Sequence, residues 1–471
     1  MTHFILNDQE VKTAIPAGTT VLDFVRYHKR LVGTKIGCRE GDCGACTVLV
    51  GDFENNKLVY RSMTSCLLPL ANVQGKHVVT VEGINGKELT PVQQALVDAN
   101  GSQCGFCTIG FVMSLTGFSL HDTQQDYTKA IESIDGNICR CTGYKSIERA
   151  ATIISTMLDN KPEKDTLQWL VDNHFIPEYF LSIKERLDVI KKQSLVIEKD
   201  TLDTLTIGGG TDLNVQKHAL VKKSALQSLF DETSLKNIVV ENGQCKIGAS
   251  VTVTHFSESS IIQETFPRLK DHIKLVSSTP IRNMATLAGN IVNASPIGDM
   301  SIFFLALNAS LVLNNNGDLR TILLKDFYKG YKTLDKSPKE IIVQIIFDIP
   351  SKNSYFNFEK VSKRTHLDIA SVNAALSMRL NDAGVIEDIH LSAGGVAPFP
   401  KYLSATANFL KGKKPEAEVL KAAIDIINTE IAPISDARGT TDYKRLLLRQ
   451  LFIAHFAEHR KEILNEVLTT I

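Results

Sequence analysis

At 471 residues the chain is long enough for about three or four domains, each with its own core. Its 52 basic residues balance 52 acidic ones, which excludes nucleic acid or an anionic membrane as an electrostatic partner. The first residues are polar and acidic where a secretory signal needs an apolar core, and the longest apolar stretch, Ile302–Leu313, is too short to span a bilayer. The sequence therefore predicts a soluble cytoplasmic protein whose cysteines are metal ligands or catalytic groups rather than disulfides.

Residues 1–85 indicate a small α+β domain, because short alternating stretches surround one helical stretch. The predicted helix is Thr20–Leu31, with Thr19 or Thr20 as its cap. The residues that this helix places on one stripe are Val21, Phe24, Val25 and His28. The predicted strands are Phe4–Leu6, Val11–Ala14, Thr47–Val50, Leu58–Arg61 and Val78–Val81.

Four cysteines of this domain follow the spacing C-x4-C-x2-C-x19-C, which is the plant-type arrangement for a [2Fe–2S] cluster. Gly37, Gly41 and Gly44 lie among them, and glycine permits the turns that point backbone N–H groups at sulfur. A zinc site is the alternative, although zinc more often uses paired C-x2-C knuckles. The members of this first quartet are Cys38, Cys43, Cys46 and Cys66.

Residues 86–158 show helical periodicity alone, which predicts a compact four-helix domain. Thr90 caps the first helix, and Pro91 occupies its first position. The other predicted helices are Thr108–Leu120, Tyr127–Ser133 and Ser146–Leu158.

A second quartet of cysteines, spaced C-x2-C-x31-C-x1-C, lies at the starts of two of these helices. Helix N-termini favour thiolates, because their free N–H groups and dipole stabilise negative charge. The spacing is not that of a ferredoxin, so an iron–sulfur cluster, a zinc site and a redox C-x2-C pair all remain open from the residues alone. The members of this second quartet are Cys104, Cys107, Cys139 and Cys141.

Residues 159–174, which begin with the charged stretch DNKPEKD, indicate a linker. Beyond it we predict two α+β domains, residues 175–352 and 353–471. Their predicted strands are Leu205–Gly210, Ile238–Ala249, Ala309–Leu313, Ile341–Phe347, Ser371–Leu380 and Val385–Ser392, and their predicted late helices are Glu416–Ile427 and Tyr443–Leu464. Cys245 stands alone in a strand-like stretch, as a small buried residue does.

Two segments of the 175–352 domain indicate a site for a phosphate-bearing cofactor. The triplet Gly208–Gly210 follows a strand-like run but lacks the G-x-G-x-x-G spacing of a Rossmann fold. Small residues in Thr286–Asn290 would let backbone amides approach a pyrophosphate, and Asp299 offers an acceptor for cofactor hydroxyls.

The cysteine quartets and their flanks together resemble the iron–sulfur half of the molybdenum hydroxylases, the xanthine dehydrogenase and aldehyde oxidase family. The strings that carry this resemblance are GCREGDCGACTV, the pair Ser65–Cys66, QCGFCTIGFVMS and NICRCTGY. The resemblance implies a β-grasp ferredoxin-like domain and a four-helix domain, each with one [2Fe–2S] cluster held by its quartet. It also implies that Gln103 contacts a molybdopterin cofactor on a partner, although a helix-start hydrogen bond explains Gln103 equally well.

The glycine triplet and the second segment resemble the FAD-binding module of the same family, which is related to the vanillyl-alcohol-oxidase type flavoproteins. A C-terminal α+β flavoprotein domain would follow it. Lys360 could instead end an ordinary charged strand, and Val276 stands where several family members carry an aromatic residue beside the flavin. The residues implied to bind FAD are Thr206, Ile207, Gly208, Gly209, Gly210, Thr211, Asp212, Leu213, Thr286, Leu287, Ala288, Gly289, Asn290, Asp299, Ile345 and Lys360.

The resemblance implies an electron-transfer subunit of a purine-oxidising (hypoxanthine or xanthine) dehydrogenase, with the molybdopterin centre on a large partner subunit in a heterotetramer of two small and two large chains. Electrons would pass from the second cluster to the first, then to FAD and NAD. No catalytic acid or base is expected in this chain. The alternatives are the equivalent subunit of an aldehyde or N-heterocycle hydroxylase, with oxygen or another acceptor, and a stand-alone iron–sulfur flavoprotein electron carrier.

Overall fold

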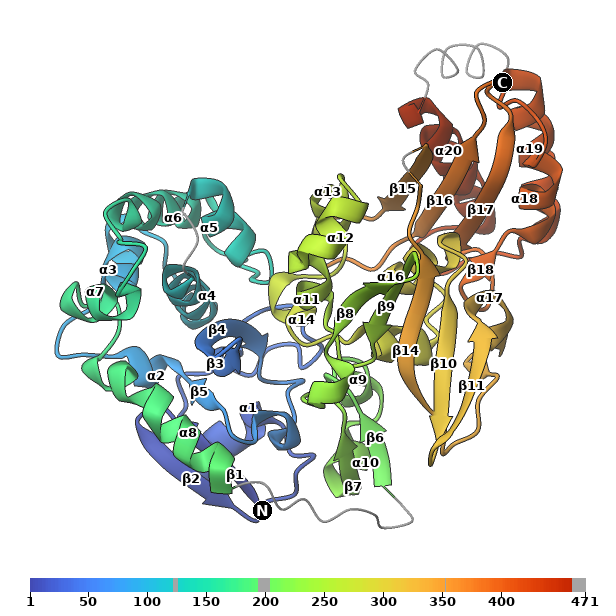
Figure 1. Cartoon of the computed structure of the whole chain (residues 1–471). Coiled ribbons are helices and arrows are strands. Elements are labelled where there is room, and N and C mark those ends of the chain that lie inside the picture. Colours follow the sequence, from blue (N-terminus) through green and yellow to red (C-terminus); the bar gives the residue numbers. More distant parts are fainter. Residues whose placement is uncertain (122–125, 194–203, 352, 460–471) are drawn as a thin grey trace. The chain divides into compact units, whose positions relative to one another are not determined.

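A computed structural model describes residues 1–121, 126–193, 204–351 and 353–459 of the chain (Figure 1). The chain divides into two compact units. Unit 1 contains Met1–Phe230 together with Ser278–Ala285, and unit 2 contains Asp231–Ser277 together with Thr286–Ile471. Unit 1 extends past the domain boundary predicted at residue 175 as far as Phe230, and the predicted boundary stays a prediction. In the part of the chain that the structure describes, no helix is both long and apolar enough to cross a membrane.

Unit 1 begins with a five-stranded sheet of order β2-β1-β5-β3-β4, in which β1 and β5 run parallel and the other neighbours antiparallel. The predicted helix Thr20–Leu31 is shorter than expected: α1 covers Val21–Asp23 and continues as a wider π-helical turn to His28. Phe24 and Val25 are buried, but His28 is exposed, so the predicted stripe is wrong at its last position. The strands are β1 Thr2–Leu6, β2 Gln9–Thr13, β3 Thr47–Glu54, β4 Lys57–Thr64 and β5 His77–Val79.

The helices of the second region lie close to their predicted positions, because their ends carry local signals. Thr90 and Gln93 form a reciprocal capping box at the start of α3, and Asp126 caps α5. Helix α4 is buried from Gly110 to Ser119 and packs on β3 and β4, so it joins the helices to the first sheet. The helices are α2 Val81–Ile84, α3 Pro91–Asp98, α4 Thr108–Leu120, α5 Tyr127–Ser133 and α6 Lys145–Leu158.

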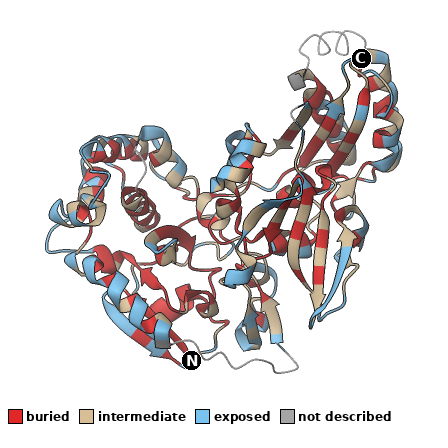
Figure 2. Cartoon of the chain, viewed as in Figure 1, coloured by how far each residue is buried: buried red, intermediate tan, exposed pale blue. Residues whose placement is uncertain are grey.

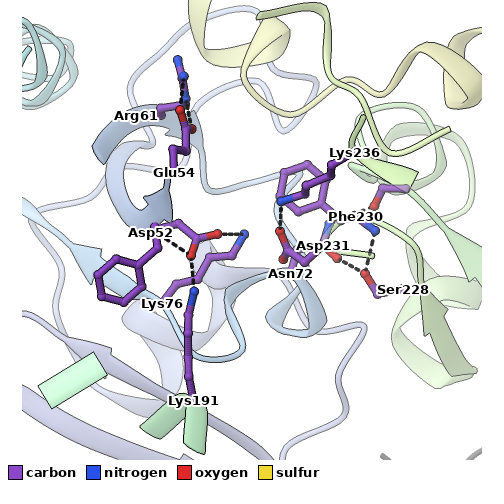
Figure 3. Close-up of polar contacts among 12 residues, drawn as sticks. Asp52, Glu54, Arg61, Asn72, Lys76, Lys191, Ser228, Phe230, Asp231 and Lys236 are labelled. Carbon is purple, nitrogen blue, oxygen red and sulfur yellow. Dashed lines mark hydrogen bonds and ion pairs between the residues drawn. The ribbon is translucent and has the colours of Figure 1, made fainter. Parts of the chain in front are cut away.

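The segment predicted as a linker contains helix α7, Thr166–Asp172, whose Leu170 joins the core of the helical region. Helix α8, Ile183–Gln193, then packs Ile183, Leu187 and Ile190 on Ile5 of the first sheet. Lys191 of α8 forms an ion pair of 2.7 Å with Asp52 of β3 (Figure 3). The remaining elements of this stretch are η3 Glu178–Ser182, β6 Thr204–Ile207, α9 Leu213–Gln216, α10 His218–Lys223 and β7 Ala225–Ser228.

Unit 2 contains a five-stranded antiparallel sheet of order β11-β10-β14-β9-β8. Cys245 lies in β9 and is fully buried, as predicted. The strands of this sheet are β8 Ile238–Glu241, β9 Gln244–Gly248, β10 Ser310–Asn315, β11 Asp318–Leu323 and β14 Ile341–Asp348, and a short hairpin pairs β12 Tyr328–Gly330 with β13 Thr333–Leu334. The helices are η4 Thr233–Leu235, α11 Val253–Glu258, α12 Ser260–Thr265, α13 Leu269–Lys274, α15 Leu287–Asn293, α16 Asp299–Ala306 and α17 Leu324–Phe327.

The C-terminal part of unit 2 is a four-stranded antiparallel sheet with helices packed on it. Its strands β16 and β17 show buried positions along most of their length (Figure 2), because helix α16 and the late helices both pack on them. The predicted helix Tyr443–Leu464 corresponds to α20, and its predicted residues 460–464 lie outside the described residues. The elements are β15 Ser354–Val361, β16 Val372–Leu380, β17 Ile386–Gly394, β18 Lys401–Tyr402, α18 Ser404–Leu410, α19 Ala417–Glu430 and α20 Thr441–His459.

Candidate functional site

The first cysteine quartet lies on the loop that leads into β3, with Cys66 arriving from the end of β4. Gly41 and Gly44 have φ angles of 81° and 68°, so both adopt the left-handed turns that the sequence predicts. A Cβ at Gly37 would lie 2.6 Å from the sulfur of Cys43, which leaves room only for glycine. The backbone N–H of Cys38 donates to Cys43 Sγ at 3.4 Å, which confirms that this loop directs amides at sulfur.

The thiols of the first quartet are arranged as two pairs. A hydrogen bond between Cys38 and Cys43 lowers the pKa of Cys38 to about 5 and raises the pKa of Cys43. A hydrogen bond between Cys46 and Cys66 likewise lowers the pKa of Cys46 and raises that of Cys66. In each pair the hydrogen bond thus favours the thiolate form of one cysteine, Cys38 or Cys46.

The second quartet is also arranged as two pairs. Cys141 Sγ lies 3.6 Å from Cys104 Sγ, and Cys107 hydrogen-bonds to Cys139. Burial raises the pKa of Cys107 to about 12. Burial also opposes ionisation of Cys139, but hydrogen bonds led by those from Thr142 outweigh it and lower the pKa of that thiol. Cys107 directly precedes α4 at its N-cap position, so this pair lies at a helix start as predicted.

The pairwise arrangement distinguishes between the metal sites that the sequence left open. No three His, Cys, Asp or Glu side chains within the described ranges converge closely enough to hold one metal ion. A structural zinc ion needs four ligands around a single centre, whereas a [2Fe–2S] cluster spreads four thiolates over two irons. None of the nine cysteines is in a disulfide. The paired thiols of both quartets agree with a dinuclear cluster, in which two thiolates bind each iron.

The second quartet lies at the surface of unit 1. Gln103, Cys104 and Cys141 are exposed, and the side chain of Phe106 is 46% exposed beside them. Gln103, which by the resemblance contacts a cofactor on a partner, is thus accessible at the surface of unit 1. In the first quartet, by contrast, Cys46 and Cys66 are buried.

The predicted diphosphate loop Thr206–Leu213 follows β6 in unit 1. A Cβ at Gly209 would lie 1.8 Å from the carbonyl oxygen of Met284, so the loop requires glycine there for close backbone approach. Asn72 donates its side-chain N–H to the Gly208 carbonyl at 2.9 Å and accepts from Ser228 at 2.7 Å (Figure 3). The buried Oδ1 of Asn214, next to this loop, has no hydrogen-bond partner, so an acceptor is available for a polar ligand.

The remaining predicted flavin residues lie in unit 2, around helices α15 and α16. Thr286 caps α15 by accepting from the Gly289 N–H, and Asn290 Oδ1 accepts from Ser301 of α16 at 3.1 Å. Ile345 is fully buried in β14, which packs against α15, and its contact with a flavin remains a prediction. Val276 is also buried.

Asp299 and Lys360 form a buried ion pair of 2.8 Å, with side-chain exposures of 13% and 2%. Lys360 therefore has a specific partner rather than ending an ordinary exposed strand, and its ammonium group also donates to the Leu275 carbonyl at 2.8 Å. Asn373 donates to Asp299 at 2.6 Å, and its own Oδ1 is buried without a partner. Sequence reasoning did not single out Asn373, although a polar residue inside the apolar run of β16 was the available signal.

Each unit by itself carries features that suit a flavin nucleotide: unit 1 has the close-approach glycine loop and the unpartnered Asn214 Oδ1, and unit 2 has the capped start of α15 and the unpartnered Asn373 Oδ1. The set is divided between the units: Thr206–Leu213 belong to unit 1, and the other predicted residues belong to unit 2. The assignment of individual residues to the cofactor stays a prediction.

Four family models match successive parts of the chain. They describe a 2Fe-2S iron-sulfur cluster binding domain at residues 4–70 and a [2Fe-2S] binding domain at residues 80–152. The others describe the FAD binding domain in molybdopterin dehydrogenase at residues 183–351 and the CO dehydrogenase flavoprotein C-terminal domain at residues 357–459.

Named relatives point to the same family. Xanthine dehydrogenase of Emericella nidulans is 31% identical over 88% of this chain and 35% of its own length. Xanthine dehydrogenase of Blastobotrys adeninivorans is 29% identical over 94% of this chain and 39% of its own length. The chain thus spans between about a third and two fifths of the length of these relatives.

A solved structure of carbon monoxide dehydrogenase from Hydrogenophaga pseudoflava aligns with the chain at a TM-score of 0.51 and 25% identity, over 57% of this chain and 91% of the solved one. The predicted α+β multidomain fold is confirmed, while the predicted domain boundaries stay predictions. The chain belongs to the molybdenum hydroxylase family, of which it carries the two iron–sulfur domains and the FAD-binding and flavoprotein C-terminal domains.

Proposed function

We propose that the chain is the electron-transfer subunit of a xanthine dehydrogenase, which passes electrons from a molybdopterin centre on a partner subunit to NAD during oxidation of hypoxanthine or xanthine. The observation that supports this most directly is the arrangement of eight cysteines as two quartets of paired thiols, of which the second has one exposed pair, in a chain with an FAD-binding domain. Such a chain can receive electrons at its surface and hold them inside.

The chain's own residues would bind and tune the groups rather than react with substrate. The first quartet would hold one [2Fe–2S] cluster and the second quartet the other, with N–H groups of Cys38 and Thr142 directed at sulfur. When bound, the clusters would carry single electrons, and FAD would collect two of them with a proton and supply them to NAD as one hydride. The glycine loop, Thr286 and the Asp299–Lys360 pair would bind the flavin.

The purine substrate and the NAD acceptor rest on the relatives named xanthine dehydrogenase. In the proposed arrangement the molybdopterin centre would lie on a separate large subunit, two of each forming a heterotetramer. Gln103 and Phe106, exposed beside the second quartet, would face that subunit. We place the complex in the cytoplasm, where reduced thiols are available for metal binding.

A purified complex with its large subunit would test the proposal. We expect xanthine-dependent NAD reduction, with little activity towards aldehydes and slow transfer to oxygen. Preferential aldehyde or N-heterocycle oxidation would instead support the hydroxylase alternative. A lone chain that is monodisperse and fully active with its physiological donor would support a stand-alone electron carrier and contradict the subunit proposal.

A further inference from the structure

Residues Ser278–Ala285, here called the bridge segment, leave unit 2 and fold as part of unit 1. The segment contains the short helix α14, Thr279–Arg282, and the chain returns to unit 2 at Thr286, the cap of α15. The bridge segment contacts both cysteine-bearing regions of unit 1. Neither the family resemblance nor the fold required it to do so.

The first contact is a buried ion pair with the helical region. Arg282 Nη2 donates to Asp135 Oδ2 at 2.6 Å, and the two side chains are only 12% and 2% exposed. The other carboxylate oxygen of Asp135 accepts from the Thr279 backbone N–H at 2.7 Å. Arg282 Nη2 also donates to Thr279 Oγ1 at 2.7 Å, so one guanidinium fixes both the carboxylate and the start of α14.

Asp135 directly precedes the residues that join the two quartets. Ile138, next to Cys139, donates its backbone N–H to the Cys43 carbonyl at 3.0 Å. Asn137 donates its side-chain N–H to the Gly44 carbonyl at 3.2 Å. The position of Asp135 therefore affects both cysteine loops. Asn137 and Ile138 contact the loop of the first quartet, and Cys139 belongs to the second quartet.

The bridge segment also contacts the first quartet's domain. A Cβ at Gly41 would lie 2.7 Å from the side chain of Ile281, so that side chain packs directly on the cysteine loop. Asn283 donates to the Ser62 carbonyl of β4 at 2.8 Å, and Thr64 of the same strand donates to the sulfur of Met284 at 3.6 Å. The ion pair and these contacts hold the two cysteine regions from one short segment.

We propose that Arg282 is a positioning residue: through Asp135 it fixes the separation and orientation of the two cluster sites, and thereby the rate at which an electron crosses between them. The inference rests on the proposed function, because it needs both clusters. A buried ion pair is weak evidence for stability in itself, whereas it can fix one arrangement among several. Removing Arg282 would take the guanidinium away from the buried Asp135 carboxylate, and the turn that carries Asp135 would shift to reach water.

The test compares Arg282→Met with Arg282→Lys in the full chain, with Arg61→Met as a matched control. Arg61 forms a bidentate pair with Glu54, both bonds 2.8 Å, within the β3–β4 hairpin (Figure 3). The readouts are iron and sulfide content, the magnetic interaction between the two reduced clusters by low-temperature EPR, and the inter-cluster electron-transfer rate after rapid one-electron reduction.

We expect Arg282→Met to keep both clusters, weaken their magnetic interaction and slow inter-cluster transfer by about tenfold or more, since small misplacements are costly. Arg282→Lys, which keeps the charge but loses the planar geometry, should give an intermediate rate, and Arg61→Met should match the unaltered chain.

An unchanged interaction and rate in Arg282→Met would overturn the inference, as would an equal loss in Arg61→Met. If Arg282→Met fails to fold, Arg282→Lys decides: a slowed rate supports the inference, and an unaltered rate overturns it. A single cluster signal in the unaltered chain would instead contradict the proposed function. That result differs from the results that would overturn the role of Arg282 alone.

Discussion

The two cysteine quartets differ in their exposure to solvent. In the first, Cys46 and Cys66 are buried, and the surrounding glycines have neighbours that leave no space for a Cβ. In the second, Cys104 and Cys141 are exposed, and a Cβ at Gly105 or Gly143 would meet nothing within 4 Å. Cys139 of the second quartet is also buried, so the contrast lies between pairs: the Cys46–Cys66 pair is enclosed, whereas the Cys104–Cys141 pair is presented to solvent. An enclosed site suits retention of an electron, and a presented site suits exchange with another protein.

Ligand replacement should give the largest effects and test whether the two sites are independent. Cys43→Ser is expected to abolish one [2Fe–2S] signal and Cys139→Ser the other, since a thiolate is lost from a different cluster in each. Low-temperature EPR of the reduced chain measures both signals. One signal in the unaltered chain would refute the assignment of two clusters.

The exposed quartet predicts a second, smaller effect on assembly. Phe106→Asp should weaken binding of the large subunit by about 2 kcal/mol or more, as loss of an aromatic anchor at an interface does. Both cluster signals should stay and the thermal stability of the lone chain should change little, because nearly half of Phe106 is already exposed. Calorimetric titration with the large subunit measures the affinity. Leu319→Asp, at an exposed residue of unit 2, is the matched control.

The glycines of the two cysteine loops provide a direct contrast in packing. Gly44 and Gly143 have similar φ angles of 68° and 66°, so alanine suffers comparable backbone strain of about 1–2 kcal/mol at either position. At Gly44 the added Cβ would also lie 2.3 Å from the Gly136 carbonyl oxygen, which should add about 1–3 kcal/mol of overpacking.

Denaturant unfolding of Gly44→Ala and Gly143→Ala measures this contrast. Equal losses of unfolding free energy would show that the enclosed loop is no tighter than the exposed one. A weaker first-cluster EPR signal in Gly44→Ala alone would further support the difference.

The features that sequence reasoning predicted are those with local causes. The helices Thr108–Leu120 and Tyr127–Ser133 were predicted with their observed ends, because their signals are local: the first is a predominantly apolar run, and Asp126 caps the second. The two cysteine quartets were equally predictable from the sequence, since the spacing of their members is a local feature.

The features that were missed depend on distant partners. Helix α7 was predicted as linker because it follows a charged stretch. Its helical state depends on packing of Leu170 in the core of the helical region, which the local sequence does not indicate. The Arg282–Asp135 pair joins residues 147 positions apart, and no sequence feature near either residue indicates its partner. The helix predicted at Thr20–Leu31 shortens because the chain must turn into the cysteine loop, and a positive φ at Arg30 ends any helical continuation.

The smallest predicted effect concerns pH and the domain of the enclosed quartet. His77 is fully buried, and this burial lowers its pKa to about 3. Its Nε2–H donates to the Asn7 carbonyl at 2.9 Å, so Nδ1 accepts from the Tyr60 hydroxyl at 2.8 Å and the ring is neutral.

The unfolded chain binds a proton at this histidine near pH 6.5, whereas the folded chain does so only near 3. The unfolding free energy should therefore fall as the pH drops from about 6.5 towards 3, by at most about 1.4 kcal/mol per pH unit for this group. Urea unfolding between pH 7 and 5, followed by fluorescence, measures the slope in the unaltered chain and in His77→Gln. The variant should lose stability at pH 7 but show the shallower slope. An identical slope would mean that groups other than His77 cause the acid sensitivity of the enclosed domain. Burial of His77 would then not make the pH response of this domain differ from that of the helical domain.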